Sequence, residues 1–147
     1  MKSTITVEIS RPQAQVAELF SNPRNTTRWM HDVDRIEVVS GEPGMPGSKY
    51  RLVPGKGNMV FVATVLSRDL PHQVRLSLDS STVVVSVTGT FKVLSPTKTL
   101  LVSQEVFRFN GVISSIFGFL ARFAIRKAHR RHMKAFKTFA ETEVRVD

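Results

Sequence analysis

Two histidines near the end of the sequence carry side chains suited to acid–base chemistry. His129 and His132 are three residues apart, which makes them neighbours on the surface of an α-helix. A neutral imidazole in a partly buried position can act as a general acid or base. The favoured alternative is a core histidine whose ring nitrogens bond to the neighbouring sheet, because buried polar groups are usually hydrogen-bonded. No third histidine or carboxylate recurs at a useful spacing, so we expect no metal site.

A second acid–base candidate is the short segment that contains His31, Asp32 and Asp34. It precedes a predicted strand, where residues of these types are common in loops. The chain has no cysteine, which excludes disulfides and thiolate chemistry. It also lacks the G-x-S-x-G, H-E-x-x-H and glycine-rich phosphate-binding motifs. We expect no cofactor, and an enzymatic role would depend on His132 or His31.

The positive charge is concentrated in one segment. The net charge is +9, from 21 Lys and Arg against 12 Asp and Glu. Between Val112 and Lys137 there is no acidic residue, and the seven basic residues are Arg122, Arg126, Lys127, Arg130, Arg131, Lys134 and Lys137. Subtracting these seven from nine leaves +2 for the rest of the chain. Such a face could bind anionic lipid. The favoured interpretation is that these residues form an ordinary solvated helix face. Nucleic acid is disfavoured, because no aromatic residues are interleaved with the charges.

The elements that position these residues form an α+β pattern. Thr4–Ile9 alternates as a strand does, and start signals at Ser10–Gln13 (a capping box) and Ser21–Pro23 predict two short helices. From Arg35 to Phe109 the apolar period is two, and turn signals separate the runs. This pattern predicts an antiparallel meander with one buried face. Val112 to Thr142 is predicted to be a helix about 46 Å long, which needs a curved sheet to lie in.

The predicted long helix has an apolar side and a basic side. At about 100° per residue, one side collects Phe117, Ala121, Ala124, Ile125, Ala128, His132, Ala135, Phe136 and Phe139. We expect this side to face the sheet, with its alanines either in close contact or bordering unfilled space. Ile116, Phe119, Leu120 and Phe123 point away from it. They would meet the short helices, edge a cavity entrance, form a homodimer contact or mark a membrane surface.

Several local motifs lie in the same order as these elements. They are Ile9–Pro12 with Val16–Pro23, then Arg28–Met30, the turn Gly41–Arg51, and Phe109–Gly111 before the helix that ends at Phe139–Glu141. In this order the sequence resembles the START-like superfamily, the birch-pollen-allergen and polyketide-cyclase-like group called SRPBCC. The resemblance covers nearly the whole chain. It implies a helix-grip fold, with a curved antiparallel sheet of about six or seven strands wrapped around a long C-terminal helix. It also implies an apolar cavity for a lipid, polyketide or steroid.

We therefore expect one domain over residues 1–147 that binds a small apolar ligand, such as a lipid or polyketide-like molecule, as a carrier or sensor. The residues expected to line the cavity are Trp29, Tyr50, Leu52, Phe91, Phe117, Ala121, Ala124 and His132. Trp29 has an alternative role as an anchor that packs the second short helix onto the sheet.

Two other functions stay open from the sequence. One is a cyclase- or dehydrase-like enzyme that uses His132 or His31. The other is an interaction module whose basic helix contacts an anionic membrane or an acidic partner. We expect a cytoplasmic location, because the first ten residues contain no apolar block typical of a signal peptide and the longest apolar stretch is too short for a bilayer.

Overall fold

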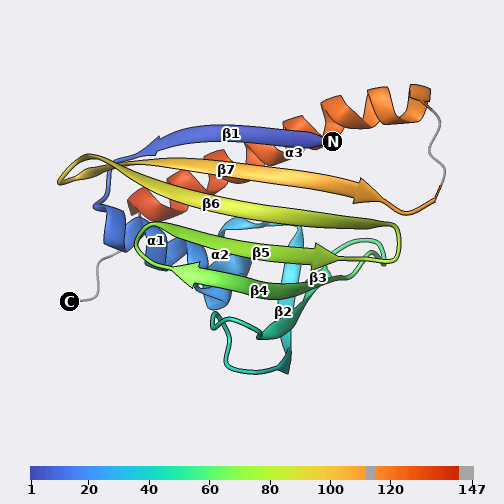
Figure 1. Ribbon diagram of the computed structural model, residues 1–147, viewed down its shortest axis with the longest axis horizontal. Coiled ribbons are helices and arrows are strands. Elements are labelled where there is room, and N and C mark those ends of the chain that lie inside the picture. Colours follow the sequence, from blue (N-terminus) through green and yellow to red (C-terminus); the bar gives the residue numbers. More distant parts are fainter. Residues whose placement is uncertain (112–114, 143–147) are drawn as a thin grey trace.

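The computed structural model describes residues 1–111 and 115–142, with Ser115 described by its backbone alone. Seven strands form one antiparallel sheet: β1 (Lys2–Ile9), β2 (Val33–Ser40), β3 (Lys49–Pro54), β4 (Phe61–Asp69), β5 (Gln73–Asp79), β6 (Val83–Ser95) and β7 (Lys98–Phe109). The helices are α1 (Gln13–Ser21), the 3-10 turn η1 (Pro23–Asn25), α2 (Thr26–Trp29) and α3 (Ser115–Thr142). The predicted helix-grip fold is confirmed, because the sheet curves around α3 and two short helices follow β1 (Figure 1).

The strand order is β1-β7-β6-β5-β4-β3-β2, so that β2 to β7 form a meander and β1 joins it through β7. The alternation of β6 buries Val83, Val85 and Val87 on the concave face, as the period of two predicts. On β7 the sequence left the facing open. In the structure Leu101 and Ser103 are buried, so the odd-numbered residues in this part of β7 face α3.

Local start signals give mixed results. The capping box expected at Ser10–Gln13 is wrong: α1 begins after Pro12 without a side-chain cap. The backbone N–H of Ser10 instead donates to Glu141 Oε2 at 2.8 Å, and Gln13 Nε2 donates to the Phe91 carbonyl at 2.8 Å. The groups that would form the capping box therefore bond to α3 and β6 instead of to each other. At the second signal, Asn22 Oδ1 accepts from the Arg24 N–H at 3.0 Å and caps η1 as predicted.

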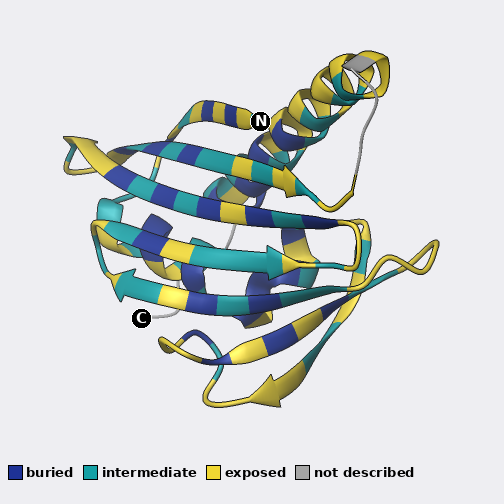
Figure 2. Cartoon of the chain, turned by 45° about the vertical axis from the view of Figure 1, so that its right-hand side comes forward, coloured by how far each residue is buried: buried dark blue, intermediate teal, exposed yellow. Residues whose placement is uncertain are grey.

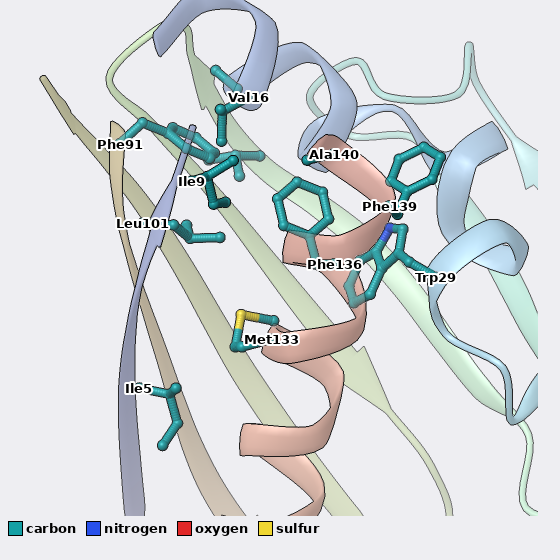
Figure 3. Close-up of a cluster of buried hydrophobic side chains, with 12 residues drawn as sticks. Ile5, Ile9, Val16, Trp29, Phe91, Leu101, Met133, Phe136, Phe139 and Ala140 are labelled. Atoms are coloured by element: carbon teal, nitrogen blue, oxygen red, sulfur yellow. The ribbon is translucent and has the colours of Figure 1, made fainter. Parts of the chain in front are cut away.

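An aromatic cluster joins the short helices, the sheet and the C-terminal half of α3 (Figure 3). The Phe20 ring stacks on Trp29 at 5.8 Å and meets Phe91 and Phe136 edge-on at 5.7 and 5.1 Å. Gly89 on β6 lies beneath Phe20, where a Cβ atom would come within 2.9 Å of the ring. Trp29 is 7% exposed, so the role of anchor fits it well.

Only the second half of α3 is gripped by the sheet. His129, Met133, Phe136 and Ala140 are buried, whereas the first turns of the helix extend past the strands and are largely exposed (Figure 2). The prediction that Phe117 and Ala124 face the sheet is therefore wrong: Phe117 is 58% exposed, and Ala124 is exposed too. The predicted helix start at Val112 lies outside the described residues.

The basic side of α3 is solvent-exposed with one exception. Arg122, Arg126, Lys127, Arg130, Arg131 and Lys134 are exposed. Lys137 is not part of a free solvated face, because its Nζ donates to the Glu8 carbonyl and to Glu141 Oε2, both at 2.7 Å. It ties α3 to β1. Within residues 1–111 and 115–142, no helix is long and apolar enough to cross a bilayer.

Candidate functional site

Two adjacent cavities lie between α3, α2 and the concave face of the sheet. The outer one has a volume of about 220 Å³ and includes the exposed Met59 in its wall, and the inner one has a volume of about 60 Å³. Five residues line both of them: Met30, Leu52, Leu78, Glu105 and His132. We treat the two as compartments of one site, the outer compartment and the inner compartment.

The secondary structure places these side chains. Leu52 on β3, Leu78 on β5 and Glu105 on β7 occupy inward positions of the pleat, which alternate with outward ones. Ala128 and His132 are four residues apart on α3, so they lie one turn from each other and both line the outer compartment. The walls of the outer compartment are otherwise mainly apolar, and its charged or titratable residues are Asp32, Glu105, His129 and His132.

His129 is the hydrogen-bonded core histidine. Its Nδ1 lies 2.8 Å from Ser3 Oγ and its Nε2 lies 2.9 Å from Ser103 Oγ, and the residue is only 1% exposed. Burial, with the nearby His132 and Arg126 charges, lowers the pKa of His129 to about 4. The ring is therefore neutral at pH 7, with one nitrogen donating and the other accepting. Its role is to join α3 to β1 and β7.

Glu105 is a buried carboxyl group in the wall of both compartments. Its side chain is 18% exposed, and its Oε1 lies 3.5 Å from His129 Nδ1. Burial raises the pKa of Glu105 to about 7, because the charged form loses its hydration. A carboxyl group that is half protonated near neutral pH is able both to donate and to accept a proton.

His132 is the histidine that faces the ligand space. Its Nε2 lies 3.3 Å from Asp32 Oδ1, but the two atoms do not have hydrogen-bond geometry. Burial lowers the pKa of His132, and the neighbouring Asp32 carboxylate partly opposes this effect. Among the described side chains, the buried polar atoms without a hydrogen-bond partner are Ser21 Oγ, Trp29 Nε1, Arg68 Nε and His132 Nε2. Three of these four residues, all except Arg68, line the inner compartment.

The structure brings together half of the residues predicted to line the cavity. Trp29 and Tyr50 line the inner compartment, and Leu52 and His132 line both. Burial raises the pKa of Tyr50 to about 12, so its hydroxyl group stays neutral.

The other predicted lining residues lie elsewhere. Phe91 packs in the aromatic cluster, half-buried Ala121 lines neither compartment, and Phe117 and Ala124 are exposed. The helix runs past the sheet before it reaches the cavity, so the alanine that borders open space is Ala128.

From the sequence, Glu105 was a polar strand residue whose facing could not be determined, and the weak acid–base candidate His31 lies away from the site. His31 is exposed and outside both compartments. Glu105 has the same parity along β7 as Leu101 and Ser103, which face inward. The residues of the opposite parity are also largely apolar, so the sequence did not indicate which face of β7 is buried. Across the described ranges, no cluster of three or more His, Cys, Asp or Glu side chains could hold a metal ion.

The sequence matches a family model described as polyketide cyclase / dehydrase and lipid transport, over residues 1–141. A search of curated proteins finds no match. The structure resembles a START superfamily protein from Mycobacterium smegmatis, with a TM-score of 0.75 and 16% identity over 95% of this chain and 97% of that one.

Two further solved structures show the same fold. An aromatase/cyclase from Streptomyces sp. R1128 has a TM-score of 0.79 at 12% identity, covering 99% of this chain and 96% of that one. Ara h 8.0201 has a TM-score of 0.69 at 14% identity, covering 97% and 100%. These identities support the shared fold alone. Because the family model covers almost the entire sequence, this chain belongs to the polyketide cyclase/dehydrase and lipid-transport family.

Proposed function

We propose that the protein binds a small, largely apolar ligand with at least one hydrogen-bonding group, as a carrier or sensor. The observation that carries the proposal is a two-compartment apolar site with a buried polar atom, His132 Nε2, that lies beside Asp32 but makes no well-formed hydrogen bond. An unpaired buried polar atom costs about 1–3 kcal/mol, which a ligand oxygen or nitrogen at this position would recover.

The dimensions favour a compact ligand. Ligand-binding pockets usually have volumes of about 300–1,000 Å³, and the outer compartment, at about 220 Å³, is below that range. A ring system or a short chain suits this space better than a lipid with two acyl chains. The family description, which includes both polyketide chemistry and lipid transport, supports a ligand of this broad class.

The polar end of the site selects for a neutral group. Glu105 and Asp32 disfavour an anion there, and His132 with its lowered pKa offers a neutral imidazole at pH 7. A ligand carbonyl group can accept from Nε2–H in one tautomer of that ring, and a ligand hydroxyl group can bond to Nε2 in either tautomer. The expected ligand is therefore a compact apolar molecule with a carbonyl or hydroxyl group.

A matched pair of alanine substitutions tests the proposal. Ala128→Phe adds a ring inside the outer compartment, whereas Ala124→Phe adds the same ring to the exposed side of the same helix. Binding of the neutral fluorescent probe N-phenyl-1-naphthylamine should weaken about tenfold or more in Ala128→Phe, because the added ring occupies space that the probe needs. Ala124→Phe should retain wild-type affinity. Equal affinity in both variants would contradict the proposed site. Native mass spectrometry of freshly purified wild type then seeks the bound molecule.

A second candidate function is acid–base catalysis of the cyclase or dehydrase kind. The observation that favours it is Glu105, whose pKa of about 7 suits proton transfer, in the same wall as His132. Such reactions remove a proton from a carbon beside a carbonyl group and protonate a leaving hydroxyl group. In an assay with an aromatic β-hydroxy ketone, Glu105→Gln and His132→Gln should each abolish the loss of water that forms the enone, while probe binding persists. If the wild type shows no turnover, the catalytic function is excluded for this substrate and ligand binding remains the proposed function.

A further inference from the structure

The first turns of α3 carry an apolar surface that no described residue covers. Ile116, Phe119, Leu120 and Phe123, here called the apolar strip, are 74%, 57%, 62% and 62% exposed. We propose that this strip docks onto an anionic lipid bilayer and that the basic residues after it contact the lipid headgroups.

The strip lies on the side of α3 that faces away from the sheet. At about 100° per residue its four members fall within roughly 100° of each other, and their centre lies about 150° around the helix from the buried Phe136. The rings of Phe119 and Phe123 meet edge-on at 5.3 Å. Along the axis the strip is about 10 Å long. Four large apolar side chains in so short a length form a continuous surface, unlike the scattered apolar residues of an ordinary protein exterior.

Positive charge continues from the strip along the same side of the helix. Lys127, Arg130, Arg131 and Lys134 are exposed and follow within about 16 Å of Phe123. The sequence from Val112 to Lys137 has no acidic residue to oppose them. A helix that lies in a membrane interface has these two parts, with apolar side chains among the acyl chains and Lys or Arg at anionic headgroups. Each basic residue near such a surface adds about 1 kcal/mol of attraction.

The same charges argue against the other possible partners. A second copy of this chain, packed strip to strip, would bring two basic surfaces together, and like charges repel. Nucleic acid would use the charges and leave the four apolar side chains without a partner. An anionic bilayer satisfies both parts of the surface at once.

The position of the strip gives docking a consequence for ligand exchange. Ile125, two residues after Phe123, lines the outer compartment together with Met59, which is 49% exposed. Because Ile125 projects about 160° around the helix from Phe123, a docked α3 would itself lie between that compartment and the bilayer. This consequence rests on the proposed ligand-binding function, whereas docking itself does not.

The experiment measures vesicle binding with two matched pairs of variants. Phe119→Ser/Phe123→Ser removes the centre of the strip, and Val93→Ser/Leu94→Ser removes two exposed apolar residues at the end of β6. Lys127→Gln/Arg130→Gln removes charge beside the strip, and Arg75→Gln/Lys92→Gln removes the same charge from the exposed side of the sheet. Each protein is sedimented with vesicles of phosphatidylcholine alone and with vesicles that also contain phosphatidylglycerol.

The wild type should bind the anionic vesicles and not the neutral ones. Both variants on α3 should lose about tenfold or more in partitioning, because each change removes at least about 1.4 kcal/mol of interaction. The two control variants should partition as wild type does. Probe binding in the cavity should be unchanged in all four, which separates this test from that of the ligand-binding function.

Three results would overturn the proposal. They are no binding of wild type to anionic vesicles, equal binding by Phe119→Ser/Phe123→Ser, and a wild-type dimer in sedimentation analysis that this variant converts to a monomer. Insertion has its own readout. Trp29 is the only tryptophan and is buried, so brominated acyl chains should quench Phe119→Trp more strongly than wild type.

Discussion

Replacing Glu105 with glutamine tests whether a buried carboxyl group opposes folding at neutral pH. Glutamine keeps the shape of the side chain and removes its ability to ionise. Burial raises the pKa of Glu105 from 4.5 to about 7. Below pH 4.5 the carboxyl group is protonated in both the folded and the unfolded chain, so its ionisation does not affect stability. As the pH rises to about 7, the unfolded chain ionises first, and the free energy of unfolding falls.

The size of the effect follows from the shift. One pKa unit corresponds to about 1.4 kcal/mol, so full ionisation of Glu105 lowers the free energy of unfolding by up to about 3 kcal/mol at pH 8. Glu105→Gln should therefore gain up to about 3 kcal/mol relative to wild type between pH 4.5 and pH 8. His129, with its pKa lowered to about 4, makes the fold less stable as the pH falls from 6.5. This second effect is common to both proteins and largely cancels in the difference.

The assay is urea unfolding at a series of pH values, followed by the fluorescence of the single buried Trp29. A matched control, Glu42→Gln, removes an exposed carboxyl group from the turn between β2 and β3 and should follow the wild-type curve. If the difference between Glu105→Gln and wild type does not change from pH 4.5 to pH 8, then Glu105 is hydrated in the folded protein and the description of the cavity wall is incorrect.

Three substitutions test contacts that hold the site in place. Ser103→Ala should lower the free energy of unfolding by about 1–3 kcal/mol in urea titrations, because it leaves a ring nitrogen of buried His129 without a partner; an unchanged midpoint would mean that the bond does not form. Gly89→Ala should lower thermal stability by about 1–3 kcal/mol, because its Cβ atom would come within 2.9 Å of Phe20; wild-type stability would show that the ring moves aside easily. Lys137→Met should increase hydrogen exchange along β1, because it removes a bond from α3 to that strand; unchanged exchange would argue against a tie between the two.

The sequence was sufficient to predict the architecture, because each strand carries its own signal. Alternation at Val83, Val85 and Val87 and the turns between strands specify a meander without knowledge of distant contacts. One strand shows the limit of such local information. The period of two predicts that Ile36 and Val38 both point inward, and Val38 does pair with the buried Tyr50 of β3, yet Val38 is 54% exposed. β2 is an edge strand of the sheet, so a residue of inward parity there can lack a covering neighbour, and local alternation does not indicate which strand lies at the edge.

The site was harder to predict because it depends on where α3 meets the sheet. Ala124 and Ala128 are the same residue four positions apart on the same helix, yet one is exposed and the other lines a cavity. Helical periodicity places both alanines on nearly the same side of the helix. Only the lengths and curvature of the strands decide that the sheet stops covering the helix between them. Glu105 was hidden for a related reason, since its inward position follows from the register of β7 with β1 and β6.

The pairing of β1 with β7 has a consequence for the order of events during synthesis. Lys2 pairs with Val106 and Ile9 with Thr99, so β1 has no partner in the sheet until β7, the last of the seven strands, has left the ribosome. The hairpins from β2 to β6 can form earlier, since their partners are neighbours in sequence. Until then β1 is an open edge with Ile5 and Ile9 uncovered, the kind of segment that pairs with other chains. Contacts this distant in sequence also close slowly. A nascent chain of this protein thus exposes an aggregation-prone strand for most of its translation, and β7 and α3 protect that strand only at the end.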